Sequence, residues 1–437
     1  MKRLNLFAIV LAGTGTAAML CSPLEAAQPG LQVLYSFAGG QDASDPRAAL
    51  VADSSGNLYG TTVSGGGSAA CDSGCGAVFE LSPPKKSGGA WAEKVLHRFT
   101  GGSDGSGPLG KLVLDKQGNL YGTTYQGGDL TVDACTGGLG NVFGCGVVFE
   151  LSPPALPGGT WTETVLYSFE GSDGAYPSAG PVFDEIGNLY ATTSAGGSST
   201  QCFTNQLPGC GRVFELSPPN QTGGQWTYAG LYDFTGGNDG AISFSDLTFD
   251  LSGNLYGTTC SGGTNGGGVV FELSPPMQQN GDWMDTTLVS FPTNACPRAG
   301  VVFDSASNLF GTTSMGGEFG TVFELTPSSS GGWTESVIYQ FDQLSAEYPY
   351  STPLLDSVGN LYGTTSGGRA CGVLYRLHEN QGAWHEEQYS FSSSPEIHPC
   401  GSQGALIFGK QNALFGTSGG GGTCRAGTCG TVFGAIP

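Results

Sequence analysis

The hydrophobic and polar positions of this chain follow a unit that returns seven times. The most regular segment of the unit joins two apolar or aromatic residues to a glycine and two threonines, as in Leu58 to Thr62. Its copies are spaced 52 to 69 residues apart and begin at Leu58, Leu120, Leu189, Leu255, Leu309, Leu361 and Leu414. A unit of this length that recurs along most of a chain indicates a repeat architecture.

Four segments of the second copy are typical of β-strands: residues 111–114, 119–124, 147–151 and 161–169. The first is almost continuously apolar, which suits a strand covered on both faces, whereas the others alternate more. A tight turn from Asp115 to Asn119 joins the first two, because Asp binds the turn backbone and Gly adopts a positive φ. Four strands in each of seven units predict an all-β fold, a seven-bladed β-propeller of four-stranded blades.

The two ends of the chain predict how the ring closes. The last copy ends at a third-strand segment, Gly430 to Phe433, and lacks a fourth segment. The segment Leu31 to Phe37 has a fourth-strand sequence without a unit of its own. We therefore predict that this N-terminal strand completes the last blade and so removes the open sheet edges. Tryptophans begin the six other fourth segments: Trp91, Trp161, Trp226, Trp283, Trp333 and Trp384.

Two rows of repeated side chains permit a structural or a functional interpretation. Aromatic residues recur in the second strands, from Tyr59 to Phe415, and in the third strands, from Phe79 to Phe433. We predict that they pack between blades, and carbohydrate stacking is the alternative. The aspartate of the first turn recurs in six units, and we predict a turn role rather than metal binding or catalysis. These residues are Asp53, Asp115, Asp184, Asp250, Asp304 and Asp356, while Gly409 takes the position in blade seven.

Composition limits the partners. The chain has 437 residues, of which 15 are basic and 36 acidic, and a formal net charge of -21. Nucleic acid is not an expected partner, because phosphate binding needs clustered Lys and Arg. Membrane insertion is not expected either, because no segment after the first 27 residues approaches about 18 consecutive apolar residues. We expect a monomer without a cofactor or a metal.

Residues 1–27 have the pattern of a secretory signal peptide. Lys2 and Arg3 precede an apolar stretch, and Ala26-Ala27 suits cleavage. Residues 28–437 would then form a single seven-bladed propeller domain, secreted to the extracellular space or the periplasm. No sorting tail precedes Pro437, so we expect free secretion rather than surface anchoring.

Twelve cysteines follow the signal segment, an even number that suits an oxidising compartment. Pairs within single loops between second and third strands predict four local disulfides: Cys71–Cys75, Cys135–Cys145, Cys202–Cys210 and Cys424–Cys429. The other four cysteines lie in loops on the same face, because successive antiparallel strands reverse direction. They predict bridges between neighbouring blades, Cys260–Cys296 and Cys371–Cys400. The alternative is that these cysteines bind zinc, but none of the four histidines recurs near a cysteine pair to complete such a site.

The cysteine-bearing face is also where the repeat varies most. Its loops between second and third strands are long in blades seven, one, two and three and short in blades four to six. Binding in repeat proteins often uses loops inserted on one face, although drift in loop length is the alternative. Three loops after fourth strands carry an Asp-Gly pair, with Asp104, Asp173 and Asp239. Calcium binding there is a hypothesis and turn chemistry its alternative, since calcium usually takes six or more oxygens.

One row of positions escapes the repeat. It lies at the start of each innermost strand, between a proline row and a row of small residues: Arg47, Leu109, Ser178, Phe244, Arg298, Tyr350 and Gln403. Two arginines nearly opposite in the ring suit a carboxylate or sulfate ligand, with polar contacts from Tyr350 and Gln403. The alternative is that each arginine pairs with a nearby loop carboxylate. We predict a ligand site there that also includes Phe244 and Asp246, an acidic residue inside a first strand.

The D-x-x-G-N-L-Y-G-T-T strand and the G-x-V-F-E-L strand resemble the GloVer (Gloeobacter/Verrucomicrobia-type) repeats of secreted bacterial proteins. The resemblance covers residues 31–437 and implies a secreted β-propeller without an established reaction. One function is a non-catalytic binding or scaffold module that holds a glycan, peptide or protein on the disulfide-braced face or at the channel mouth. The alternative is an extracellular polysaccharide lyase or hydrolase at that mouth.

Catalysis would need an acid–base cluster that departs from the repeat. The irregular candidates form no recognisable pair, so we assign no catalytic residue; they are Asp246, His97, His378, His385 and His398.

Overall fold

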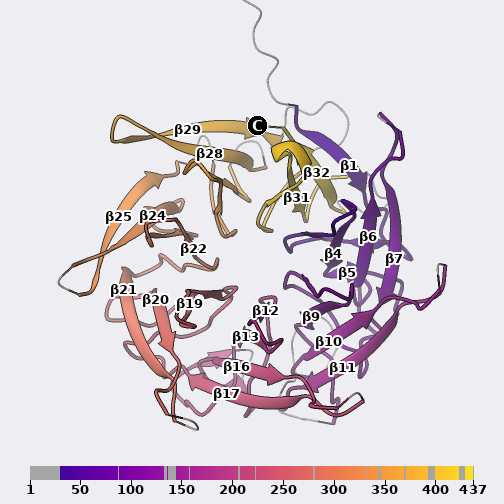
Figure 1. Ribbon diagram of the computed structural model, residues 1–437, viewed down its shortest axis with the longest axis horizontal. Coiled ribbons are helices and arrows are strands. Elements are labelled where there is room, and N and C mark those ends of the chain that lie inside the picture. Colours follow the sequence, from indigo (N-terminus) through magenta and orange to yellow (C-terminus); the bar gives the residue numbers. More distant parts are fainter. Residues whose placement is uncertain are drawn as a thin grey trace, which may run out of the picture.

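The structure, a computed structural model, describes residues 30–436 except 87, 132–134, 136–143, 157, 205–206, 222, 279–280, 330, 343–345, 369–370, 392–398 and 423–428. The predicted signal segment, residues 1–27, lies outside this part. Seven four-stranded antiparallel sheets form a ring around a central axis (Figure 1), and the described residues contain no α-helix. The predicted seven-bladed β-propeller is confirmed.

Each blade places its first strand nearest the axis and its fourth strand at the rim (Figure 1). Blade one contains β3 (Val51–Ala52), β4 (Leu58–Thr62), β6 (Ala77–Ser82) and β7 (Ala92–Arg98). Blade two contains β8 (Val113–Leu114), β9 (Leu120–Thr124), β10 (Val147–Ser152) and β11 (Thr162–Ser168). Blade three contains β12 (Val182–Phe183), β13 (Leu189–Thr193), β16 (Arg212–Ser217) and β17 (Thr227–Asp233). Blade four contains β18 (Thr248–Phe249), β19 (Leu255–Thr259), β20 (Gly266–Ser274) and β21 (Met284–Pro292).

The remaining blades follow the same order. Blade five contains β22 (Val302–Phe303), β23 (Leu309–Thr313), β24 (Thr321–Pro327) and β25 (Trp333–Gln340). Blade six contains β26 (Leu354–Leu355), β27 (Leu361–Thr364), β28 (Val373–Asn380) and β29 (Ala383–Ser390). Blade seven contains β30 (Ile407–Phe408), β31 (Leu414–Ser418), β32 (Thr431–Ala435) and β1 (Gln32–Ser36). Two loop ribbons pair β2 (Ala43–Ser44) with β5 (Ser64–Gly65), and β14 (Phe203–Thr204) with β15 (Leu207–Pro208).

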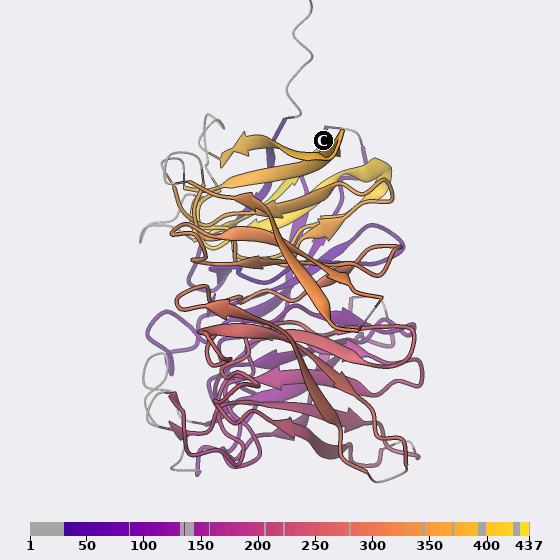
Figure 2. The ribbon, with the colours of Figure 1, turned by 90° about the vertical axis from the view of Figure 1, so that its left-hand side faces the viewer.

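The N-terminal strand closes the ring as predicted. β1 pairs antiparallel with β32, with Gln32 opposite Gly434 and Ser36 opposite Thr431. Seen from the side (Figure 2), the strands run between the two faces of the ring. Loops from second to third strands and from fourth strands to the next blade share one face. We call it the disulfide face.

The innermost strands are shorter than the sequence indicated. In blade two only Val113–Leu114 pairs with the second strand, whereas residues 111–114 were expected to. The chain before Val113 lies against blade three instead: a Cβ added to Gly110 would approach the Ala179 carbonyl carbon to 2.5 Å. First strands converge near the axis, and this crowding leaves little length for pairing and requires small side chains.

Aromatic side chains fill the spaces between blades. Tyr59 on the second strand of blade one contacts Trp161 of blade two, with ring centroids 6.3 Å apart. A buried phenylalanine at the end of each fourth strand contacts a third-strand ring of the next blade at 5.0 to 5.2 Å between centroids. The pairs are Phe37–Phe79, Phe99–Phe149, Phe169–Phe214, Phe234–Phe271, Phe291–Phe323, Phe341–Tyr375 and Phe391–Phe433. The core therefore lies between blades, as predicted for these rows.

Closer to the axis, a ring of buried hydrogen bonds from threonine side chains links the blades. We call it the threonine ring. The first threonine of each Thr-Thr or Thr-Ser pair donates to a backbone carbonyl of the small-residue row in the next blade. The seven bonds are Thr61 to Gly110, Thr123 to Ala179, Thr192 to Ser245, Thr258 to Ala299, Thr312 to Ser351, Thr364 to Gly404 and Thr417 to Ala48. Their lengths run from 2.8 to 3.4 Å. The last bond joins blade seven to blade one.

The repeated aspartates stabilise the first turn of their blades. Asp115 accepts hydrogen bonds from the backbone and side-chain nitrogens of Asn119, each at 2.8 Å, and from the Tyr121 hydroxyl at 3.2 Å. These contacts give the aspartate a local structural role, as predicted. Blade seven, which has Gly409 instead, makes the turn with a short 3-10 segment, η2 (Lys410–Asn412).

Carboxyl groups on the rim strands are buried between blades. Burial raises the pKa of Glu163 on β11 to about 7. Two groups of the preceding blade have smaller and opposite effects on this pKa: the His97 imidazole lowers it and the Asp104 carboxylate raises it. One Glu163 carboxylate oxygen is buried with no hydrogen-bond partner among the described residues. Burial also raises the pKa of two equivalent carboxyls to about 7, those of Glu93, beside Asp42 and Arg98, and of Asp285, beside Asp239.

Replacing Thr123 by Val is expected to lower the free energy of unfolding by about 1–2 kcal/mol, because the Ala179 carbonyl then loses its buried donor. The control is Thr162→Val, at an exposed position of β11. Urea denaturation of both variants measures the difference. Equal stability of the two variants would contradict a contribution from the threonine ring.

The rim carboxyls predict that the protein loses stability as the pH rises. Folding raises the pKa of Glu93 and Glu163 from 4.5, and that of Asp285 from 3.8, to about 7. The folded state therefore binds more protons than the unfolded chain between these values, and its stability falls through this window. We expect a lower melting temperature at pH 8 than at pH 5.5.

The variant Glu163→Gln should reduce the difference in melting temperature between pH 5.5 and pH 8, because it removes one of the groups that gain a proton on folding. Glu185→Gln, at an exposed turn position, serves as the control and should leave the difference as in wild type. A melting temperature that rises from pH 5.5 to 8 in wild type would refute this explanation.

Candidate functional site

A cavity of about 370 Å³ opens where the central axis meets the disulfide face. We call it the mouth cavity; its lining consists of Arg47, Leu109, Tyr125, Ser178, Phe244, Arg298, Tyr350 and Gln403. All seven members of the unconstrained row belong to it, one from each blade. Of the six residues predicted to form a ligand site, the cavity brings five together and leaves out Asp246.

Fixed backbone positions bring these side chains together. Each row residue directly precedes a small residue, and the threonine ring binds the carbonyl of that small residue. Arg298 has two further constraints: Pro297 precedes it, and Cys296 is bonded to Cys260 of blade four. The start of blade five is thereby attached covalently to the blade that supplies Phe244.

Arg298 lies between two aromatic rings. Its guanidinium carbon is 4.7 Å from the ring centroid of Phe244 in blade four and 5.4 Å from that of Tyr350 in blade six. Tyr348 stacks with Tyr350, with centroids 6.3 Å apart. Within the described part of the chain, no carboxylate oxygen lies within 4 Å of an Arg298 nitrogen. The rings hold an arginine that has no anionic partner there.

Arg47 has a different environment, because a loop carboxylate neutralises its charge. Its Nε donates to both oxygens of Asp45 at 2.9 and 3.0 Å, and its Nη2 lies 2.8 Å from Asp45 Oδ2. Asp45 adopts a left-handed backbone conformation, with φ of 62°. Pairing with a loop carboxylate, the alternative for both arginines, thus applies to Arg47 and not to Arg298.

An ion pair lies below the mouth cavity, beside a second and smaller free space of about 90 Å³. Lys111 Nζ of blade two is 3.1 Å from Asp246 Oδ2 of blade four, and the Gly180 nitrogen of blade three donates to Asp246 Oδ1 at 3.1 Å. A Cβ on Gly180 would come within 2.2 Å of the Lys111 carbonyl oxygen. The glycine therefore makes room for a bridge across blade three, and Asp246 forms part of the cavity floor.

A larger groove of about 1070 Å³ adjoins the mouth cavity between blades seven and one. Glycine-rich loop segments form much of its wall, together with Asp45, Asp72 and the disulfide cysteine Cys71. Arg47 and Gln403 line both spaces, so the groove and the cavity share a border. The groove lies beside the long loops of the disulfide face.

Disulfides brace this face in the predicted pairing. The described residues contain Cys71–Cys75, Cys135–Cys145, Cys202–Cys210, Cys260–Cys296 and Cys371–Cys400. Cys429 is also disulfide-bonded, but Cys424, its predicted partner, lies outside the described residues. Cys260–Cys296 and Cys371–Cys400 join neighbouring blades. The first lies near Arg298 in the sequence and the second near Gln403.

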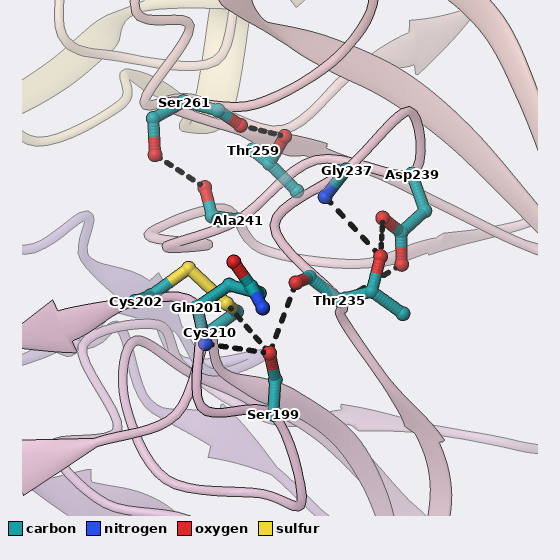
Figure 3. The surroundings of a disulfide bond; sticks show 10 residues. All are labelled: Ser199, Gln201, Cys202, Cys210, Thr235, Gly237, Asp239, Ala241, Thr259 and Ser261. Atoms are coloured by element: carbon teal, nitrogen blue, oxygen red, sulfur yellow. Dashed lines mark hydrogen bonds between the residues drawn. A yellow bond between two sulfur atoms is a disulfide. The ribbon is translucent and has the colours of Figure 1, made fainter.

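Figure 3 shows how the long loop of blade three is attached to the next connection. Ser199 lies beside the Cys202–Cys210 disulfide and donates to the Thr235 carbonyl at 2.9 Å. In the same connection, Asp239 accepts from the Thr235 nitrogen at 2.7 Å and from the Tyr232 hydroxyl at 3.0 Å. These bonds occupy the carboxylate of one loop for which calcium was a hypothesis. In the described ranges, no group of three acidic, His or Cys side chains is arranged to hold a metal ion.

Two features of the mouth were missed in the sequence. Tyr125 lines the cavity directly after Thr123-Thr124, where the other blades have no aromatic residue, and that irregularity was a usable signal. The Lys111–Asp246 pair was also detectable, as opposite charges at one register. The irregular histidines are elsewhere: His97 lies 3.5 Å from Asp104 at the rim, and His378 stacks on His385 across β28 and β29. His398 lies outside the described residues.

The part of the chain that the structure describes contains no helix that could serve as a membrane span.

Comparison with solved structures finds matches of low similarity. One match is a putative 6-phosphogluconolactonase from Bacteroides uniformis, which is 14% identical to this chain. The matched region covers 78% of this chain and 84% of the lactonase chain, with a TM-score of 0.48. A gluconolactonase from Xanthomonas campestris is 13% identical over 76% and 85%, with a TM-score of 0.39. The NanB sialidase from Streptococcus pneumoniae is 14% identical over 89% and 67%, with a TM-score of 0.40. Likeness at this level carries no argument about activity.

Sequence comparison identifies the family. No curated protein matches the chain. A family model described as the Gloeobacter/Verrucomicrobia repeat matches residues 134–370, which is more than half of the chain. The units on both sides of this range carry the same strand motif and complete the same ring. The protein belongs to the Gloeobacter/Verrucomicrobia repeat family.

Proposed function

We propose that the protein is an extracellular, non-catalytic binding propeller that holds the end of a glycan in the mouth cavity. One observation carries this proposal: the seven side chains that the repeat leaves unconstrained, one from each blade, line a single cavity. Packing explains the aromatic, threonine and aspartate rows. The closed ring brings the variable row to one space, and its members differ in charge, size and polarity, which packing between blades does not require.

The size and chemistry of the cavity suit a sugar. A volume of about 370 Å³ lies at the lower end of the range of small-molecule sites. Sugars present apolar C–H faces as well as hydroxyl groups. Phe244, Tyr350 and Tyr125 supply aromatic surface, while Ser178 and Gln403 supply hydrogen-bonding groups. The adjoining groove offers a path for the rest of a longer chain.

The acidic groups near the mouth favour binding over the hydrolase alternative. Glycoside hydrolysis generally uses a pair of carboxyl groups, one of them protonated near neutral pH. Asp45 and Asp246 are each engaged by a cation, Arg47 and Lys111 respectively. Carboxyls with a raised pKa, such as Glu163, lie between blades on the rim strands instead.

The disulfides support an extracellular or periplasmic location. Bonds such as Cys260–Cys296 form and persist in oxidising compartments and are rare in the cytosol. A covalently braced face also keeps its loops in position without a partner, which suits a binding protein outside the cell.

The test is a panel of neutral and acidic glycans, scored for both retention and cleavage, with wild type and Leu109→Trp. The tryptophan should fill part of the mouth cavity and weaken binding at least about tenfold, because the ligand end loses its space. Leu156→Trp is the matched control: Leu156 is 75% exposed in the loop between β10 and β11, on the opposite face. We expect retention without products, and equal binding by the control and wild type.

Three results would overturn the proposal. Retention of no glycan by wild type would remove the binding function. Equal binding by Leu109→Trp and wild type would move the site away from the mouth. Release of shortened products would favour the catalytic alternative. Melting temperatures of both tryptophan variants show whether the fold survives the substitutions.

A further inference from the structure

We infer that the mouth cavity recognises a sugar with a single carboxylate, as in a terminal uronic acid, through Arg298. The inference rests on the proposed function and names the class of ligand that this site takes. It depends on the charge balance of the mouth, the geometry of the arginine and the position of the cavity floor.

The charge balance of the mouth leaves one positive charge without a partner. Three cations line the cavity and the narrow space below it: Arg47, Lys111 and Arg298. Asp45 neutralises Arg47, and Asp246 neutralises Lys111. Arg298 has neither an ion pair nor a hydrogen bond to any described residue. A ligand with one negative charge would therefore complete the balance.

The aromatic rings hold Arg298 in a form that suits a carboxylate. Phe244 and Tyr350 lie 4.7 and 5.4 Å from the guanidinium carbon and stabilise the cation through their π faces. No described residue accepts a hydrogen bond from the N–H groups of this guanidinium, which leaves these donors available for a ligand. Two parallel N–H groups match the two oxygens of a carboxylate.

The arginine is also preorganised before a ligand arrives. Pro297 and the Cys260–Cys296 disulfide limit the backbone that carries it, and the Ala299 carbonyl accepts from Thr258 at 2.8 Å. A side chain already held in position loses less conformational entropy on binding than a mobile one. This feature separates Arg298 from the many arginines that lie freely on protein surfaces.

The surroundings argue against a polyanion. The whole chain carries a formal net charge of -21, so a densely charged polymer would be repelled before it reached the mouth. Below the cavity the free space has a volume of only about 90 Å³ and is lined by the Lys111–Asp246 pair, which favours a ligand that enters by its end. A terminal sugar with one carboxylate meets both conditions, and the hydroxyl and amide groups of Ser178 and Gln403 are suited to the ring hydroxyls of a sugar.

The experiment compares two ligands that differ only in charge. The probes are a disaccharide with glucuronic acid at its non-reducing end and the methyl ester of the same molecule. Titration calorimetry should show wild type binding the acid at least about tenfold more tightly than the ester, because only the acid forms the charge-assisted pair. An N-acetylated tripeptide with a free carboxylate tests a peptide end against the sugar.

Variants assign the preference to a residue. Arg298→Gln should reduce affinity for the acid about tenfold or more and leave affinity for the ester within about threefold. Arg298→Lys keeps the charge but not the two-pronged geometry, and it should recover only part of the preference. The control is Lys116→Gln, which removes one positive charge from an exposed turn on the opposite face and should change neither affinity.

The outcomes separate this inference from the proposed function. Equal affinity of wild type for the acid and the ester, or an Arg298→Gln variant that binds the acid as wild type does, would overturn the inference while glycan binding stood. Tighter binding of the tripeptide than of the uronic acid would overturn the assignment to a sugar. Retention of no glycan in the preceding panel would instead remove the proposed function itself.

Discussion

Each blade has too few strands to cover its own faces, so every blade depends on contact with the next. The buried aromatic pairs supply the apolar part of that contact, as where Phe99 lies against Phe149. The threonine ring supplies the polar part, since a hydroxyl such as that of Thr123 binds a carbonyl that first-strand crowding excludes from water. Neither set of contacts exists within one isolated unit. Stability therefore belongs to the junctions between blades.

These junctions determine which positions remain free for function. A row that packs between blades is repeated because every junction needs it, whereas a row that lines the mouth cavity is released from the repeat. The row from Arg47 to Gln403 is released in this way, yet each of its members is held beside a residue that the threonine ring anchors. Variable chemistry is thus presented on a rigid backbone, which is the arrangement that precise binding sites use.

Much of this structure was predictable because it follows from repetition and strand direction. The prediction of the disulfide between Cys260 and Cys296 followed from the rule that successive antiparallel strands reverse direction, which places the two loops on one face. The different environments of the two arginines were not predictable in the same way. The left-handed backbone of Asp45 allows that carboxylate to reach Arg47, whereas Arg298 depends on rings from both neighbouring blades. Side-chain directions of this kind come from the closed ring and are absent from any single unit.

The pairing of β1 with β32 has a consequence for how the chain folds as it is made. Residues 32–36 are synthesised long before their pairing partners in β32 (Thr431–Ala435). Until β32 is present, β1 has no sheet to join, and no strand pairing positions the Phe37 ring against Phe79 of blade one. Blades can stack in order of synthesis, but the stack keeps two unfinished ends. Closing the ring therefore brings together two strands that are separated by almost the whole propeller in the order of synthesis.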